Sequence, residues 1–186
     1  NIVLDRAKGY ETYLRQILAG LEASDAEIVF MVEHDVLYNE THFQFVPPRK
    51  DTYYYNLNTW KLRPEDGHAI HYDCMQVSGL CAYRELLVQH YQKRLERFLS
   101  DGKYDRRIGY EPGMRPPPQG IDEFGYETWV SDKPLVDIRV AGTMSKTRWS
   151  QSEFRNKKTC QNWIESDEIP GWGKTEGRFN EWLHDL

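Results

Sequence analysis

The stretch IVFMVEHD at residues 28–35 determines the fold that we expect, because a run of apolar residues ends abruptly on an acidic tripeptide. Residues 28–32 are continuously apolar, as is typical of a strand buried on both faces of a parallel sheet. In open α/β sheets, ligands bind outside the carboxyl ends of such strands. Glu33 and Asp35 follow at that end, and residues i and i+2 of an extended chain project to the same side. The stretch therefore predicts an α/β fold with an acidic site at one sheet edge.

The segments around this stretch alternate between helical and strand-like patterns. The expected helices cover residues 1–24, 84–99 and 122–129. The expected strands, besides the opening run, cover residues 52–57, about 74–80 and 135–140. A helix that leads directly into a strand is half of an α/β unit, so we expect a mostly parallel, Rossmann-like sheet flanked by helices.

Two regions of irregular sequence suggest how the chain is organised. Residues 103–120 are rich in Gly and Pro and are expected to form a long loop of the kind found in lids and binding sites. Residues 1–140 are expected to form the α/β core, and residues 141–186 a polar, irregular extension. The extension contains Trp149, Trp163, Trp172 and Trp182. Because each indole buries a large apolar area, we expect the extension to pack on the core.

Length, charge and cysteine content exclude several classes of protein. The chain has 186 residues, which is enough for a core, and its aromatic content of 13% argues against disorder. No apolar run approaches the roughly 20 residues that a membrane span needs. The net charge of −5 argues against a general binder of duplex DNA. Three cysteines without CxxC spacing favour reduced thiols and a cytoplasmic location over a disulfide framework.

The paired carboxylates of Glu33 and Asp35 would repel one another unless a cation joined them. Oxygen ligands of this kind suit Mg²⁺ or Mn²⁺, and either ion would in turn hold a diphosphate. The alternative is an ordinary polar strand end with both acids solvated. The apolar strand before the acids favours the metal site, because a motif is informative when its structural context is also predicted.

The stretch FMVEHD at residues 30–35 resembles the acidic metal-binding signature of GT-A glycosyltransferases, the nucleotide-diphospho-sugar enzymes, and is family 2-like. Four further stretches are similar to a glycosyltransferase-like group of bacteria and bacteriophages. They are SGLCAYR at 78–84, YEPG at 110–113, VDIR at 136–139 and IPGWG at 169–173, together with Trp149. The resemblance implies a GT-A-like fold and transfer of a sugar from a nucleotide-diphosphate donor, with a uridine diphosphate sugar first among the donors.

The resemblance also implies roles for particular residues. Asp35 is expected to contact the Mn²⁺ or Mg²⁺ ion, and Glu33 to lie toward the donor ribose or a metal-bound water. In an inverting reaction a carboxylate takes the proton of the acceptor. Glu127 is the first choice for this base and Glu111 the second, with Asp122 and Glu123 as further competitors. A solvated helix face is the alternative for Glu127.

The chain departs from the GT-A pattern in two places. Relatives are expected to carry a metal-binding His directly after the Asp-Ile-Arg stretch, whereas this chain has Val140 and Ala141 there, which cannot bind a metal. In addition, only 32 residues precede Glu33, so an N-terminal βα portion of the domain is expected to be missing. The missing His and the Trp-rich C-terminal extension keep open a second hypothesis, a non-catalytic binding or assembly module that retains the fold.

The remaining candidates are weaker. Trp60 is a candidate for stacking on a sugar or base, with core packing as the alternative. Arg148, in a basic run with Lys146, is a candidate for the donor diphosphate or a nucleic-acid backbone, with a solvated face as the alternative. The spacing of His68, His71, Asp73 and Cys74 matches no standard zinc site, so packing roles are favoured there. The acceptor stays open between a modified nucleic-acid base, a glycan and a protein, and the acidic pI of 5.7 disfavours DNA.

Overall fold

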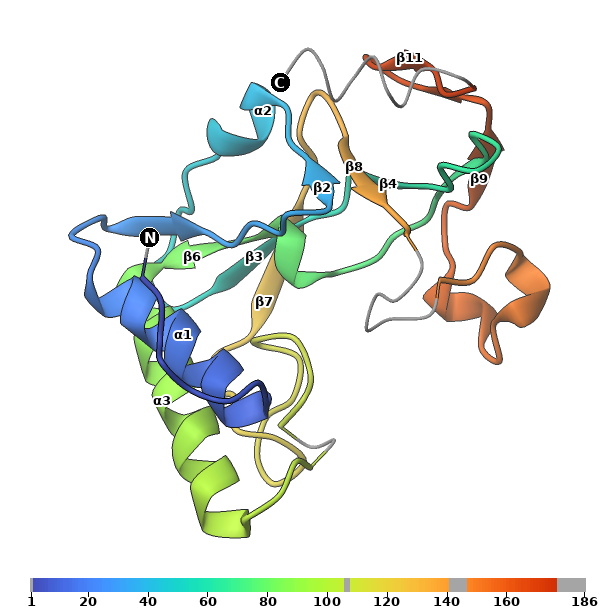
Figure 1. Ribbon diagram of the computed structural model, residues 1–186. Coiled ribbons are helices and arrows are strands. Elements are labelled where there is room, and N and C mark those ends of the chain that lie inside the picture. Colours follow the sequence, from blue (N-terminus) through green and yellow to red (C-terminus); the bar gives the residue numbers. More distant parts are fainter. Residues whose placement is uncertain (1, 106–107, 141–146, 177–186) are drawn as a thin grey trace. The chain divides into compact units, whose positions relative to one another are not determined.

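The computed structural model describes residues 2–105, 108–140 and 147–176, and these residues form an α/β fold with mixed sheets (Figure 1). The helices are α1 (Tyr10–Glu22), α2 (Glu40–Phe43) and α3 (Arg84–Asp101), with 3₁₀ turns at Val77–Gly79, Gln151–Glu153 and Lys157–Thr159. The strands are β1 (Ile28–Phe30), β2 (Val36–Leu37), β3 (Tyr53–Asn56), β4 (Thr59–Leu62), β5 (Ala69–His71), β6 (Leu80–Tyr83), β7 (Tyr126–Trp129), β8 (Leu135–Ile138), β9 (Ile164–Ser166), β10 (Glu168–Ile169) and β11 (Gly173–Lys174). Within the described part of the chain, no helix has the length and apolar character that crossing a membrane requires.

The chain divides into two compact units, each assembled from three segments of the sequence. The first unit contains Asn1–Phe30, Val46–Tyr54 and Leu80–Glu127. The second unit contains Met31–Phe45, Tyr55–Gly79 and Thr128–Leu186. The acidic motif at residues 33–35 and the Val-Asp-Ile-Arg stretch at 136–139 both belong to the second unit.

The first unit is built around two helices that pack side by side (Figure 1). Helix α1 buries Leu14, Leu18 and Leu21, which share one face because they lie four and three residues apart. Helix α3 follows directly after β6 and ends at Gly102, whose φ of +66° lets its N–H donate to the carbonyl oxygen of Phe98. Strand β1 pairs antiparallel with β6 in the sheet of order β1-β6-β3-β7.

The second unit contains a five-stranded sheet of order β2-β8-β4-β5-β9, whose two faces differ in character. One face carries the apolar core of the unit, against which the half-buried Trp172 packs. The buried members of this core are Leu37, Trp60, Leu62, Ala69, Val136, Ile138 and Ile169. Strand residues alternate between faces, so Lys61 and Asp137, which are register partners in β4 and β8, lie on the opposite face. That face adjoins the acidic motif.

The expectation of a mostly parallel sheet is wrong for the described strand pairs. Strands β4 and β8 are parallel, whereas the pairs β1–β6, β2–β8, β4–β5 and β5–β9 are antiparallel. Strand β1 is only half-buried, and Val32, which closes the apolar run, is 58% exposed. A short apolar run does not by itself distinguish a strand at the end of a sheet from a central parallel one.

Two local predictions are also corrected. Residues 122–129 do not form a helix: Tyr126–Trp129 is strand β7, because aromatic residues favour strands and tertiary pairing overrides weak local preference. The strand expected around 74–80 begins only at Leu80. The helix over 84–99 and the strand over 135–140 are confirmed as α3 and β8. From the expected C-terminal extension, β9 pairs with β5, while Trp182 lies outside the described residues.

A buried polar network fixes the connection between α2 and the strands of the second unit. The side-chain oxygen of Asn56 accepts hydrogen bonds from the backbone N–H groups of Asn58 and Ser131, at 3.0 and 3.2 Å. The Asn56 amide nitrogen therefore donates, to the Ser131 hydroxyl and to Nδ1 of His42 at 2.8 and 3.1 Å. Because Nδ1 accepts, the imidazole of His42 is neutral. Burial lowers the pKa of His42 to about 4.

We expect the free energy of unfolding to decrease as the pH falls from about 6.5 to 4. The unfolded chain protonates His42 near pH 6.5, whereas the folded chain resists protonation down to about pH 4, so stability is complete above pH 6.5 and is lost below it. The loss attributable to His42 amounts to about 3 kcal/mol. Urea unfolding measured at several pH values checks this. The His42→Asn variant keeps an acceptor for Asn56 and should have a flatter pH dependence; an unchanged slope would contradict the assignment.

Candidate functional site

The acidic motif lies beside the end of strand β8, which is about 100 residues further along the sequence. The backbone carbonyl oxygen of Asp35 accepts a hydrogen bond from the N–H of Ile138 at 2.8 Å. The next residue, Val36, is the register partner of Asp137 in the antiparallel pair β2–β8. The sheet therefore brings Glu33-His34-Asp35 next to the Asp137-Ile138-Arg139 stretch.

Tyr38 and Ser78 hold Glu33 in place. Its backbone N–H donates to the Tyr38 hydroxyl at 2.9 Å, and that hydroxyl donates to the carbonyl oxygen of Ser78 at 3.2 Å. The Ser78 hydroxyl interacts with the Glu33 carboxylate closely enough to oppose the rise of its pKa. Partial desolvation of this carboxyl raises the pKa of Glu33, and the neighbouring charge of Asp35 raises it further. The two carboxylates are thus close enough to repel one another.

A buried ion pair borders the acidic motif on the β8 side. Asp137 is 3% exposed, and its Oδ1 lies 3.0 Å from the Nη1 of Arg139. Gln76 Nε2 also donates to Asp137, at 3.3 Å, and Arg139 donates to the hydroxyl of Thr147. Arg139 thus compensates Asp137, and its charge also lowers the pKa of Glu33.

Three functional candidates were missed by sequence reasoning: Lys61, Gln76 and Ser78 lie under the acidic motif and are linked by hydrogen bonds. Lys61 had a signal, since it alternates with the apolar Trp60 and Leu62 and so had to occupy the polar face of the sheet. Ser78 opens the stretch SGLCAYR quoted above, but nothing in the sequence pointed to its contact with Gln76, and Gln76 had no signal, because these contacts arise only from the tertiary fold.

The residues present are compatible with a divalent ion bound together with a substrate. Over residues 2–105, 108–140 and 147–176, no three His, Cys, Asp or Glu side chains cluster tightly enough to hold a metal by themselves. Mg²⁺ is commonly bound through one or two carboxylates plus the phosphates of a substrate and water. Glu33 and Asp35 supply that number of carboxylates. The His expected as a further metal ligand is replaced by Val140 and Ala141. Val140 is 45% exposed, and Ala141 lies outside the described residues.

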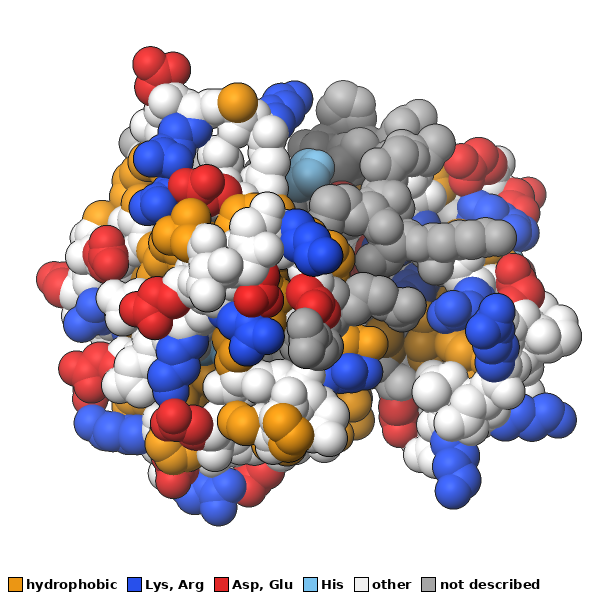
Figure 2. All heavy atoms as spheres, turned by 90° about the horizontal axis from the view of Figure 1, so that it is seen from below, with side chains coloured by type: hydrophobic (Ala, Val, Ile, Leu, Met, Phe, Trp, Pro, Cys, Tyr) orange, Lys and Arg blue, Asp and Glu red, His pale blue; other side chains and the backbone are white. Residues whose placement is uncertain are grey.

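Trp60 and Arg148 occupy different environments. Trp60 is 4% exposed and belongs to the apolar core of the second unit, so its ring is engaged in core packing. Arg148 is exposed, and its guanidinium carbon lies 5.0 Å from the centre of the Phe154 ring. Lys146, its partner in the basic run, lies outside the described residues. On the face drawn in Figure 2, acidic and basic side chains are interspersed.

The candidate catalytic bases belong to the first unit. Glu127 lies on β7, and its Oε1 is 2.7 Å from the Nη2 of Arg49 on an exposed surface. Glu111 is half-buried at the start of a turn, where its carbonyl oxygen accepts from the N–H of Met114. Of their competitors, Asp122 is buried against His90, and Glu123 forms a surface ion pair with Lys93.

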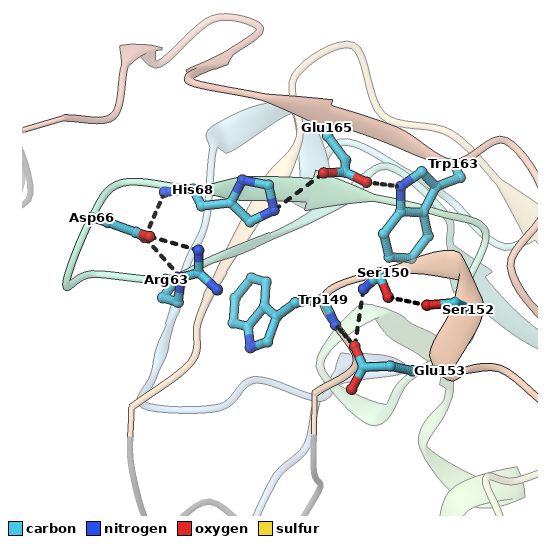
Figure 3. Close-up of polar contacts among 9 residues, drawn as sticks. All are labelled: Arg63, Asp66, His68, Trp149, Ser150, Ser152, Glu153, Trp163 and Glu165. Carbon is cyan, nitrogen blue, oxygen red and sulfur yellow. Dashed lines mark hydrogen bonds and ion pairs between the residues drawn. The ribbon is translucent and has the colours of Figure 1, made fainter.

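A second polar cluster surrounds His68 in the second unit (Figure 3). The His68 ring lies 5.8 Å from that of Trp149, and its Nε2 is 3.5 Å from a carboxylate oxygen of Glu165. Trp163 donates to the same carboxylate through Nε1 at 2.8 Å, and the Arg63 guanidinium lies 5.0 Å from the centre of a Trp149 ring. These contacts tie the segment after residue 147 to β4, β5 and the turn between them.

The other residues with zinc-like spacing have separate partners. Nδ1 of His71 lies 2.9 Å from the carbonyl oxygen of Thr59, and Asp73 accepts from the side-chain amide of Asn162 at 2.9 Å. Cys74 is half-buried, with its sulfur 3.9 Å from the carbonyl oxygen of Met75. These residues therefore have packing contacts of their own.

Comparison with known proteins adds no further constraint: no protein-family model, curated protein or solved structure matches the chain.

Proposed function

We propose that the chain is a metal-assisted glycosyltransferase of GT-A-like type that takes a sugar from a nucleotide-diphosphate donor. The observation that carries the proposal is the pairing of β2 with β8, which sets Glu33 and Asp35 beside Asp137 and Arg139. Both stretches belong to the resemblance described above, and they are separated by about 100 residues in the sequence. Their proximity is what a donor site at this sheet edge requires.

In this proposal each residue at the edge has a defined task. Asp35 and Glu33 would hold Mn²⁺ or Mg²⁺, which, when bound, offsets the negative charge that develops on the departing diphosphate. Arg139 keeps the buried Asp137 compensated, so that the cation is directed to the acidic pair. Glu127 is the proposed base for the acceptor proton, and Glu111 is the second choice. A uridine diphosphate sugar is the first donor to test.

The acceptor is proposed only as a class. A glycan, a protein and a modified nucleic-acid base all offer a nucleophilic hydroxyl. The net charge of −5 gives no support to a polyanionic acceptor. A glycan or protein hydroxyl is therefore the first acceptor to test.

We expect the chain to hydrolyse uridine diphosphate sugars slowly in the presence of Mn²⁺ and to stop when EDTA removes the ion. Water then replaces the acceptor: its oxygen bonds to the anomeric carbon, and the bond from that carbon to the diphosphate breaks. Released nucleotide diphosphate is measured with and without Mn²⁺, against a panel that includes guanosine diphosphate sugars. Turnover that persists in EDTA would refute the metal-assisted mechanism. Calorimetric binding without turnover would instead favour the non-catalytic module.

A further inference from the structure

A chain of partly buried hydrogen bonds lies next to the acidic motif, on the face of the five-stranded sheet that carries Lys61 and Asp137. The Nζ of Lys61 donates to the Oε1 of Gln76 at 3.2 Å. The Nε2 of Gln76 donates to the Ser78 hydroxyl at 2.6 Å and to the Oδ2 of Asp137 at 3.3 Å. The Ser78 hydroxyl also interacts with the Glu33 carboxylate, since it opposes the rise of the Glu33 pKa. Gln76 is therefore the branch point between strands β4 and β8 and the acidic motif.

The direction of every bond in this chain is fixed by chemistry. An ammonium group only donates, so Lys61 forces the carbonyl oxygen of the Gln76 amide toward itself. The two N–H groups of the amide then point to Asp137 and Ser78. Because the Ser78 oxygen already accepts from Gln76, its own hydrogen is directed to Glu33, a carboxylate that can only accept when ionised. Lys61 thus determines, through Gln76, which way the Ser78 hydroxyl points.

Burial makes the arrangement rigid. Lys61 is 5% exposed and Ser78 is fully buried, and the Lys61 ammonium also lies 4.6 Å from the centre of the Tyr72 ring. Gln76 itself is half-buried, but its partners Lys61, Ser78 and Asp137 are buried, and buried polar groups that lose a partner are costly, so its amide has one satisfactory orientation. A second connection joins the two segments, because the Tyr38 hydroxyl accepts from the Glu33 N–H and donates to the carbonyl oxygen of Ser78. The segment 76–78 consequently holds the acidic motif at two points.

We infer that Gln76, oriented by Lys61, is a positioning residue that sets the Glu33 carboxylate for metal binding through Ser78. The inference rests on the proposed function, because it assigns a role at the same acidic pair. Residues behind metal ligands orient them, and removing such a residue costs about 10- to 100-fold in metal affinity or activity. Gln76 touches neither donor nor ion in this proposal and acts only through Ser78 and Asp137.

The test compares Mn²⁺ binding by the whole chain and its variants, measured from the free-Mn²⁺ signal in electron paramagnetic resonance. We expect Gln76→Met to weaken Mn²⁺ binding about 10- to 100-fold, and to raise by a similar factor the Mn²⁺ concentration that supports half-maximal donor hydrolysis. Gln76→Glu, which keeps size and shape but cannot donate to Ser78, should weaken binding similarly. Gln161→Met, an exposed residue of the same unit, is the control and should leave binding unchanged.

The outcomes separate this inference from the proposed function. If the wild type binds Mn²⁺ and both Gln76 variants bind it with the same affinity, the positioning role is wrong and the proposed function stands. A wild-type chain that binds no Mn²⁺ would overturn both. If Gln76→Met lowers the thermal midpoint but Gln76→Glu folds normally and binds Mn²⁺ as the wild type does, Gln76 is merely structural and the inference is wrong.

Discussion

Replacing Asp35 by Asn should lower Mn²⁺-dependent release of sugar from the donor by at least about 100-fold, as expected when charge stabilisation at the reacting diphosphate is lost. The substitution conserves side-chain size, and the backbone carbonyl oxygen of residue 35 still accepts from the N–H of Ile138. The pairing of β2 with β8 is therefore expected to survive. What changes is the ligand: a neutral amide is a poorer partner than a carboxylate for a hard divalent cation.

Two companion variants sharpen this measurement. His34→Asn alters the exposed residue beside Asp35 without removing a carboxylate, so Mn²⁺ binding and turnover should stay within about twofold of the wild type if only surface contacts change. Glu127→Gln should retain binding of Mn²⁺ and donor but reduce transfer to an acceptor, because it removes the proposed base. If Asp35→Asn turns over as fast as His34→Asn, Asp35 is not a metal ligand and the proposed mechanism fails.

The helices and strands that depend on neighbouring residues in the sequence were predictable from it. Helix α3 combines apolar residues such as Leu87 and Tyr91 on one face with a glycine at its end, and Gly102 adopts the left-handed conformation that this position favours. Strand β8 was equally recognisable. The direction of strand pairing was not, because it depends on connections and long-range partners. The turn at Arg63–His68 makes β4 and β5 antiparallel neighbours. Within it, Gly67 has a φ of +73°, a conformation that a side chain would strain.

The candidate site was predictable in its charges but not in its supporting residues. Glu33 and Asp35 stand out because acids that follow an apolar run are conspicuous in any sequence. Their proximity to Asp137 depends on the register of β2 against β8, and register is set by the burial pattern of the whole sheet. Gln76 and Ser78 are ordinary polar residues in an irregular segment. Their role depends on burial and on hydrogen-bond direction, which a single sequence does not display.

The second large effect is expected on stability, from the residues that hold the long loop of the first unit in place. Nδ1 of His90 lies 2.8 Å from the Oδ1 of Asp122, and both side chains are at most 4% exposed. The other carboxylate oxygen of Asp122 accepts from the backbone N–H of Arg115 at 3.1 Å, and the carboxylate also hydrogen-bonds the N–H of Gly113. Asp122 therefore joins helix α3 to the loop through the His90 imidazole and the N–H of Arg115. These donors keep its pKa below the usual value despite burial, and burial lowers the pKa of His90.

Asp122→Ala should consequently lower the free energy of unfolding by about 3 kcal/mol, because it leaves buried donors without an acceptor. The matched control is Glu123→Ala, which removes the neighbouring carboxylate from a surface pair with Lys93 and should cost less than about 1 kcal/mol. Urea unfolding at pH 7 gives both values, and hydrogen exchange at the amides of Gly113 and Arg115 should accelerate in Asp122→Ala alone. Because the pKa of Asp122 is lowered in the folded chain, its contribution is complete at neutral pH and is lost only as the pH falls below the usual carboxyl value of 3.8. Equal losses at pH 7 would show that Asp122 does not hold the loop.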